Sequence, residues 1–185
     1  GVDGQTFYPT KVEESDRFKF IIFGRWDYRK CTKELIQTFL NTFGMDEKVD
    51  LIISVDNPFS IDGLESTEER LKHFGLEDNR IKVLHFPSRE EYINYIQQGN
   101  VFLSCARSEG WNLPLIEALA CGTPSICSNW GAQLQFAKDY AHLVDIIDER
   151  PAVEGEETFN YKAPGNYCEP DFDHLGKVMR DVYEN

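Results

Sequence analysis

The chain has 185 residues, of which 41% are hydrophobic, and its formal net charge at pH 7 is -13. This length and apolar content predict one domain with a sizeable core, because single domains commonly contain ~100–200 residues. The acidic balance argues against a nucleic-acid partner, since nucleic-acid phosphates attract basic surfaces.

Short apolar runs alternate with segments of helical periodicity along the chain, and no internal repeat occurs. Strands are predicted at 18–23, 49–55, 80–85, 101–105, 124–128 and 141–145, and helices at 32–43, 66–74, 89–98, 114–121, 131–137 and 172–184. The alternation predicts an α/β fold with a doubly wound, Rossmann-like parallel sheet.

A basic turn follows the first predicted strand. Gly24 ends the apolar run, and Arg25 and Lys30 precede the first predicted helix. Arg can fork onto phosphate oxygens and Lys adds a mobile point charge, so this turn suits a phosphate ligand. The same residues also fit a structural turn, in which Arg29 and Lys30 lie on the surface and Arg25 has a salt-bridge partner.

A second turn, after the strand at 101–105, carries two carboxylates around the start of a helix. Glu109 lies in the loop, and Glu117 lies about one turn inside the helix that Pro114 opens. The N–H groups from Gly110 to Leu113 approach the helix N-terminus, which favours phosphate. Carboxylates can bind sugar or ribose hydroxyls. It is equally open that Glu109 is a solvated loop residue and Glu117 a first-turn acid favoured by the helix dipole.

Ligands of open parallel sheets bind beyond the carboxyl ends of the strands, so the two turns are predicted to share one crevice. Together they resemble the donor-binding half of glycosyltransferase family 4, the retaining nucleotide-sugar enzymes of GT-B fold. The resemblance rests on Gly24-Arg25, on Lys30 five positions later, and on the run from Glu109 to Glu117, which is similar to the family's E-x7-E motif. It covers nearly all of the chain.

The resemblance implies a role for each matching residue. Arg25 and Lys30 would neutralise the donor diphosphate next to Gly24, and Glu109 would contact the transferred sugar, so that Arg25, Lys30 and Glu109 form the catalytic set. Glu117 would bind the ribose hydroxyls. The backbone amides of Gly110, Trp111, Asn112 and Leu113 would meet sugar and phosphate.

The nucleobase is expected to contact Leu84 and His85, largely through backbone groups, although His85 is favoured as a structural residue at a strand end. No metal and no cofactor is expected, because the nucleotide-diphosphate sugar is itself the donor substrate. Two residues depart from the family pattern: Cys31 and Asn112 each stand where the family usually has Gly. Asn112 is expected to add a side chain near the sugar and to retune donor choice.

Residues 1–15 look like the family's interdomain linker, and residues 16–185 look like the donor-binding domain. An acceptor domain is expected upstream, so the isolated domain is expected to be inactive. The predicted partners are a nucleotide-sugar and, through the missing domain, a sugar, lipid or protein acceptor, with peripheral membrane association also possible through that domain. The alternatives are a nucleotide-sugar epimerase-like enzyme or a non-catalytic nucleotide-sugar-binding module; no G-x-G-x-x-G or P-loop motif occurs to support a dinucleotide or P-loop enzyme.

Three further features complete the prediction. The acid-rich stretch from Asp145 to Glu157 predicts a solvated, mobile loop. Asp171 is expected to cap the last helix rather than to bind a metal. Five cysteines without paired spacing predict reduced thiols and, with no membrane span or signal peptide in the sequence, a cytoplasmic location.

Overall fold

A computed structural model of the chain describes residues 1–59, 63–152 and 165–185. Six parallel strands form its central sheet: β1 (Phe18–Phe23), β2 (Val49–Ser54), β3 (Ile81–Val83), β4 (Val101–Ser104), β5 (Ser125–Ser128) and β6 (His142–Val144). Their spatial order is β3-β2-β1-β4-β5-β6. Such a parallel order requires a crossover after each strand, and these crossovers carry the helices.

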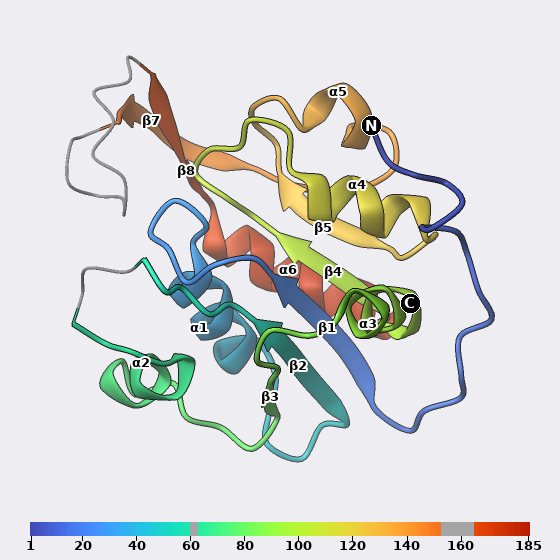
Figure 1. Cartoon of the computed structure of the whole chain (residues 1–185). Helices are drawn as coiled ribbons and strands as arrows, with labels where there is room; N and C mark the ends of the chain where they lie inside the picture. The colour runs from blue at the N-terminus through green and yellow to red at the C-terminus, as the bar shows by residue number, and fades with distance from the viewer. Residues whose placement is uncertain (60–62, 153–164) are drawn as a thin grey trace.

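Helices cover both faces of this sheet (Figure 1). They are α1 (Thr32–Thr42), α2 (Thr67–His73), α3 (Arg89–Gln98), α4 (Leu113–Ala120), α5 (Leu134–Ala137) and α6 (Phe172–Glu184). Buried side chains of α1, α2 and α6 pack against one face, and those of α3, α4 and α5 pack against the other. The predicted doubly wound, Rossmann-like sheet is confirmed. Only α5 begins noticeably late, because residues 131–133 form a turn that opens at Gly131 with φ +82°.

The central strand β1 shows why its sequence is a continuous apolar run. Successive side chains of a strand point to opposite faces. Phe20 and Ile22 enter the core beneath α1 and α6, whereas Ile21 and Phe23 enter the core beneath α3 and α4. Both faces are therefore buried, as expected for a central parallel strand.

An antiparallel hairpin follows the sheet, formed by β7 (Ile146–Pro151) and β8 (Asn166–Pro170). The prediction of a mobile loop at 145–157 is therefore wrong for residues 146–151, and the acids from Glu154 to Glu157 lie outside the described residues. Exposed side chains such as Asp148 and Glu149 hide the strand from a sequence pattern. Strand β7 forms because its backbone pairs with that of β8, whose residues Tyr167 and Cys168 are buried.

The N-terminal residues predicted as a linker pack along α3. Phe7 is 2% exposed, and its ring lies edge-on to Tyr92 with 6.3 Å between the ring centroids. The Gln97 side chain donates to the carbonyl oxygen of Tyr8 at 3.0 Å. At the other end of the chain, Asp171 accepts a hydrogen bond from the His174 N–H at 2.9 Å, which confirms the predicted cap of α6.

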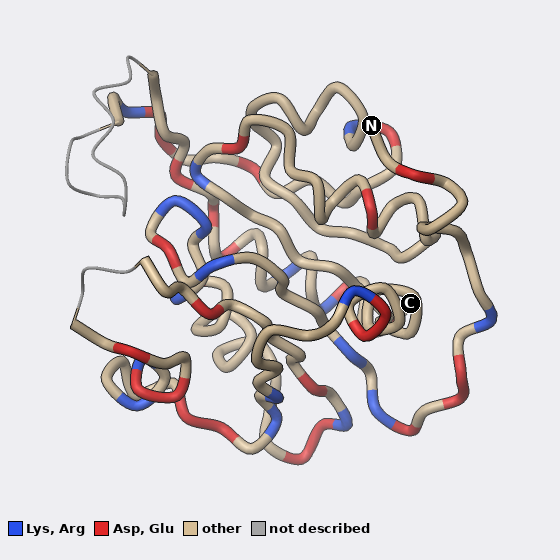
Figure 2. Tube along the Cα trace, viewed as in Figure 1, with Lys and Arg blue, Asp and Glu red and all other residues tan. Residues whose placement is uncertain are grey.

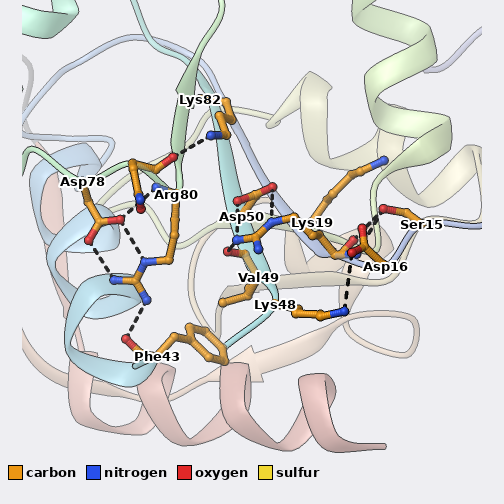
Figure 3. A network of polar contacts seen from close by, with 12 residues as sticks. Ser15, Asp16, Lys19, Phe43, Lys48, Val49, Asp50, Asp78, Arg80 and Lys82 are labelled. Atoms are coloured by element: carbon orange, nitrogen blue, oxygen red, sulfur yellow. Dashed lines mark hydrogen bonds and ion pairs between the residues drawn. The ribbon is translucent and has the colours of Figure 1, made fainter. Parts of the chain in front are cut away.

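A network of charged contacts lies at the edge of the sheet where the parallel strands begin (Figure 3). Arg17 donates two hydrogen bonds of 2.8 Å to the carboxylate of Asp50. Arg80 forks onto Asp78 at 2.9 Å and also donates to the carbonyl oxygen of Phe43 at 2.8 Å. These arginines stabilise the fold at the edge opposite to the carboxyl ends of the strands.

Candidate functional site

The two predicted turns are neighbours at the carboxyl edge of the sheet. From β1 the chain runs outward through β2 and β3, and then returns to place β4 on the other side of β1. Strand order reverses at this point, and in open α/β sheets such a switch point forms the ligand crevice. The turn at 24–31 follows β1 and the turn at 105–112 follows β4. Figure 2 shows basic residues in the first of them, within a predominantly acidic chain.

Side-chain contacts join the two turns. Lys30 Nζ donates to Glu109 Oε1, and Arg29 Nη1 lies 3.4 Å from Glu109 Oε2. Arg29 Nη1 also donates to the carbonyl oxygen of Ser108 at 2.6 Å. The Glu109 side chain is only 9% exposed, although it lies in a loop. The predicted convergence of the two turns is therefore confirmed, and Arg29 is a contact between them rather than a plain surface residue.

Arg25 and Gly24 lie in the same turn as Lys30. Arg25 Nη2 is 4.0 Å from Asp27 Oδ2, and the Arg25 side chain is 31% exposed. A Cβ atom on Gly24 would lie 3.9 Å from Lys30 Cε, so a larger residue at 24 would place its side chain beside this ammonium group. Together with Arg29, these cations concentrate positive charge at one end of an acidic domain.

Both departures from the family's glycines occur at backbone conformations that favour glycine. Cys31 has φ +55° and Asn112 has φ +61°, and each residue directly precedes a helix, α1 and α4 respectively. Asn visits this left-handed region more readily than most residues, whereas Cys does not share that preference. This chain therefore adopts a left-handed backbone conformation at both positions without a glycine.

The side chain of Asn112 faces the protein interior. Its Nδ2 donates to Ser104 Oγ at 2.9 Å and to Gln133 Oε1 at 2.6 Å, and the residue is 4% exposed. Asn112 was expected to add a side chain near the sugar, but its amide instead connects β4 to the turn before α5. Asn112 therefore presents only its backbone at the surface of the turn.

The start of α4 offers backbone donors next to Glu109. Within the described ranges, the N–H groups of Gly110, Trp111, Asn112 and Leu113 make no hydrogen bond to another protein group. The position of a Cβ on Gly110 has no atom within 4 Å. Donors at a helix N-terminus, open space and nearby cations together form a site suited to an anion.

Glu117 lies on the side of α4 that faces α3. Its Oε2 accepts a hydrogen bond from the Tyr92 hydroxyl, and its Oε1 is 3.6 Å from Arg89 Nη2. Burial, together with this carboxylate, raises the pKa of Tyr92, so the phenol remains a hydrogen-bond donor at neutral pH. The structure thus orients Glu117 through two residues of α3 that the sequence alone did not single out. Arg89 and Tyr92 are three positions apart in a predicted helix, so the sequence could have shown that they share one face of α3.

His85 lies after β3, between two carboxylates. Its Nδ1 is 3.0 Å from Asp56 Oδ2 and its Nε2 is 2.8 Å from Glu68 Oε1. Hydrogen bonds to Glu68 and then to Asp56 raise the pKa of His85. Leu84 donates its N–H to the carbonyl oxygen of Ile53 at 2.8 Å and so continues the sheet. In the described part of the chain, no group of three or more His, Cys, Asp or Glu side chains is placed to hold a metal ion.

The sequence comparison identifies the family. Residues 10–148 match the family described as glycosyl transferases group 1, so the chain belongs to the group 1 glycosyl transferases. Among curated proteins, none matches this sequence.

Solved structures of low identity share the fold. The C-terminal domain of a group 1 family glycosyl transferase from Francisella tularensis has 19% identity and a TM-score of 0.71, and the match covers all of this chain and 89% of that one. Sucrose-phosphate synthase from Thermosynechococcus elongatus has 20% identity and a TM-score of 0.70, with all of this chain matching 42% of that one. The Anabaena protein HepE in complex with UDP-glucose has 21% identity and a TM-score of 0.54, and the match covers 65% of this chain and 32% of HepE. The chain therefore spans most of the isolated C-terminal domain and less than half of the two longer chains, and it has the expected Rossmann-like half of a GT-B fold.

No helix among the described residues is long and apolar enough to cross a membrane. All five cysteines are buried, free thiols, and burial raises the pKa of Cys121 to about 11 and that of Cys127 to about 12. Cys105, Cys121 and Cys127 lie within the core, with 0%, 5% and 0% exposure.

Proposed function

We propose that this chain is the donor-binding domain of a retaining glycosyltransferase, and that it binds a nucleotide-diphosphate sugar between the turns after β1 and β4. The observation that carries the proposal is the contact of Lys30 with Glu109 at the switch point of the sheet. It brings a diphosphate-binding cation and a hydroxyl-binding carboxylate to one place. The HepE structure contains UDP-glucose, so a uridine diphosphate sugar is the first donor to test.

Each part of the site suits one part of such a donor. Arg25 and Lys30 would neutralise the diphosphate, because charge-assisted hydrogen bonds from cations to phosphate are strong. The N–H groups from Gly110 to Leu113 would bind phosphate and sugar oxygens at the start of α4. Glu109 would accept hydrogen bonds from sugar hydroxyls, since an ionised carboxylate is purely an acceptor.

The nucleoside would lie toward α3. Glu117 would bind the ribose hydroxyls, and Tyr92 and Arg89 hold its carboxylate on the side of α4 that faces α3. The backbone after β3, at Leu84 and His85, would contact the base. The imidazole of His85 already has two carboxylate partners, so we assign it a structural role in that loop.

During transfer the bond from the sugar C1 to the diphosphate breaks, a bond from C1 to the acceptor hydroxyl oxygen forms on the same face, and the hydroxyl proton passes to a phosphate oxygen of the leaving diphosphate. Negative charge grows on the leaving diphosphate, and preorganised cations stabilise it most when they need not move. Arg25 and Lys30 would supply this stabilisation, and Glu109 would hold the sugar in place. The proposal calls for no cofactor besides the donor.

The acceptor would be held by a second domain facing the same edge. Large apolar side chains are exposed in the loops at the carboxyl ends of the strands, including Phe59, Phe86, Trp111 and Leu113, which are 57%, 73%, 38% and 53% exposed. Such a rim suits a domain interface. We propose that the isolated domain binds donor but does not transfer sugar, that the acceptor class depends on the second domain, and that the protein acts in the cytoplasm, where its free thiols stay reduced.

Calorimetric titration with UDP, GDP, ADP and NAD tests the proposal. Lys30→Ala and Arg25→Ala should each weaken binding of the preferred nucleoside diphosphate by about 1.5–3 kcal/mol, the range for hydrogen bonds to charged groups. Lys48→Ala is the matched control, because Lys48 pairs with Asp16 at the opposite edge of the sheet. Preference for NAD, or unchanged affinity in both site variants, would contradict the proposed function.

A further inference from the structure

Arg107 lies between β4 and Glu109 and is almost completely buried. The residue is 3% exposed, so its side chain has no surface to offer a donor. The sequence contains no pattern that separates it from ordinary loop arginines. Its contacts, however, reach the turn after β1, the first turn of α1 and strand β8.

The guanidinium of Arg107 binds three segments at once. Nε and Nη2 each donate to the carboxylate of Glu169 in β8 at 2.8 Å. Nη1 donates to the carbonyl oxygen of Tyr28 at 2.6 Å, in the turn after β1. Nη2 also lies 3.1 Å from Glu34 Oε1 in the first turn of α1.

Backbone and ring contacts strengthen the same connection. The N–H of Arg107 donates to the carbonyl oxygen of Arg29 at 2.8 Å, and its carbonyl oxygen accepts from the N–H of Cys168 at 3.0 Å. The Arg107 Cζ atom lies 3.9 Å from the ring centroid of Tyr28. Arg107 thus holds the backbone at residues 28–29, before Lys30, and the side chain of Glu34 at the start of α1, after it.

The geometry requires a guanidinium. Its planar fork presents five donors, whereas an ammonium group has three and cannot form the two-point contact with Glu169 in the same way. Burial by itself would lower the pKa of Arg107, but hydrogen bonds to Glu169 and the nearby Glu34 outweigh burial and raise it. The side chain is therefore a permanent cation within the fold.

We propose that Arg107 is the positioning residue of the donor site: it holds the turn that carries Lys30 against the turn that carries Glu109. This inference rests on the proposed function. In the structure Lys30 and Glu109 bind each other, but a donor would engage both groups and thereby loosen that pair. Arg107 does not face the donor, so its contacts persist and keep the two turns in register during binding and transfer.

The test compares two buried arginines by calorimetric titration with UDP, or with GDP or ADP if the parent chain prefers one of these. Arg107→Lys removes the fork and keeps the charge. Arg80→Lys is the matched control, because Arg80 is 4% exposed, forks onto Asp78 and binds two carbonyl oxygens at the opposite edge of the sheet. Thermal unfolding followed by circular dichroism identifies a temperature at which both variants are folded. Under these conditions Arg107→Lys should weaken nucleoside diphosphate binding by about 10-fold or more, because small displacements of binding groups are costly, and Arg80→Lys should leave it unchanged.

A double variant separates positioning from general destabilisation. If Arg107 acts through Lys30, adding Arg107→Lys to Lys30→Ala should weaken binding much less than Arg107→Lys does in the parent chain, because the group being positioned is already gone. Additive losses would overturn the proposal, as would equal losses in Arg107→Lys and Arg80→Lys. If Arg107→Lys does not fold, Glu169→Gln takes its place with the same expectations.

The outcomes also separate this inference from the proposed function. If Lys30→Ala weakens binding while a folded Arg107→Lys does not, the positioning role is wrong and the donor site stands. If Lys30→Ala alone leaves binding unchanged while Arg25→Ala weakens it, the positioning role fails and the donor site stands. If both variants leave binding unchanged, or if the parent chain binds none of the three diphosphates, the proposed function fails and the positioning role fails with it.

Discussion

Replacing Glu109 with Gln should tighten the binding of UDP and reduce the extra affinity of UDP-glucose over UDP. In the structure the Glu109 carboxylate accepts a hydrogen bond from Lys30 and lies 3.4 Å from Arg29. Lys30 is also expected to bind the donor diphosphate. Glu109 therefore competes with the diphosphate for Lys30, while it is also expected to bind the sugar.

The size of the effect follows from the burial of this pair. The side chains of Glu109 and Lys30 are 9% and 18% exposed, so solvent screens their contact only partly. A hydrogen bond between charged groups of this kind contributes about 1.5–3 kcal/mol. If diphosphate binding gives up part of that energy, Glu109→Gln should tighten UDP binding by about 1–2 kcal/mol, which is roughly 5- to 30-fold.

The sugar part of the donor should respond in the reverse sense. The extra affinity of UDP-glucose over UDP should decrease in Glu109→Gln, because an amide is a weaker acceptor for sugar hydroxyls than a carboxylate. Isothermal titration with both ligands measures the two effects. Glu47→Gln is the control for the change in net charge, because Glu47 pairs with Arg180 away from the site. Weaker or unchanged UDP binding in Glu109→Gln would show that Glu109 and the diphosphate do not compete for Lys30.

Three further predictions address other parts of the molecule. Glu117→Ala should weaken UDP binding but leave pyrophosphate binding nearly intact, since its expected contact is to ribose; equal losses in the two titrations would make Glu117 structural. Gly110→Ala should leave the urea midpoint unchanged and weaken UDP-glucose binding, because the space beside Gly110 is open in the fold. Its counterpart Gly99→Ala should cost about 1–3 kcal/mol of stability, because the added Cβ would overlap the side chain of the buried Ile21 and lie 3.2 Å from the carbonyl oxygen of Tyr95. The raised pKa of His85 means that its two ion pairs stabilise the fold at pH values below about 6.5, and that this contribution is lost as pH rises through the raised pKa. His85→Gln should therefore lose a few tenths of a kcal/mol at pH 5.5 and nothing at pH 9 in urea unfolding, and an equal loss at both pH values would refute the linkage.

Much of the fold could be predicted because the relevant signals are local. The run from Phe18 to Phe23 is apolar on both faces, which identifies a central strand, and Asp171 precedes the last helix as a cap. The spacing of Glu109 and Glu117 places them around one helix N-terminus whatever the rest of the chain does. The right-handedness of crossovers between parallel strands narrows the possible strand orders, and the order itself is seen only in the tertiary structure.

Other features arise from contacts between distant residues. Arg107 meets Tyr28 and Glu169, which are 79 and 62 positions away in the sequence. The inward direction of the Asn112 amide depends on Gln133, at the turn before α5. Strand β7 is defined by its pairing with β8, because its own residues form a pattern typical of a charged loop.

By itself, the sequence determined the alternation of strands and helices, the basic turn after β1 and the two carboxylates around the start of α4. Hydrophobic periodicity and helix-capping rules depend on near neighbours, so these features can be recognised without coordinates. The tertiary structure decided that Lys30 reaches Glu109, that Asn112 turns inward and that a buried Arg107 connects the surrounding segments. Each of these depends on how side chains from separate elements fill one shared space, and no local pattern records that packing.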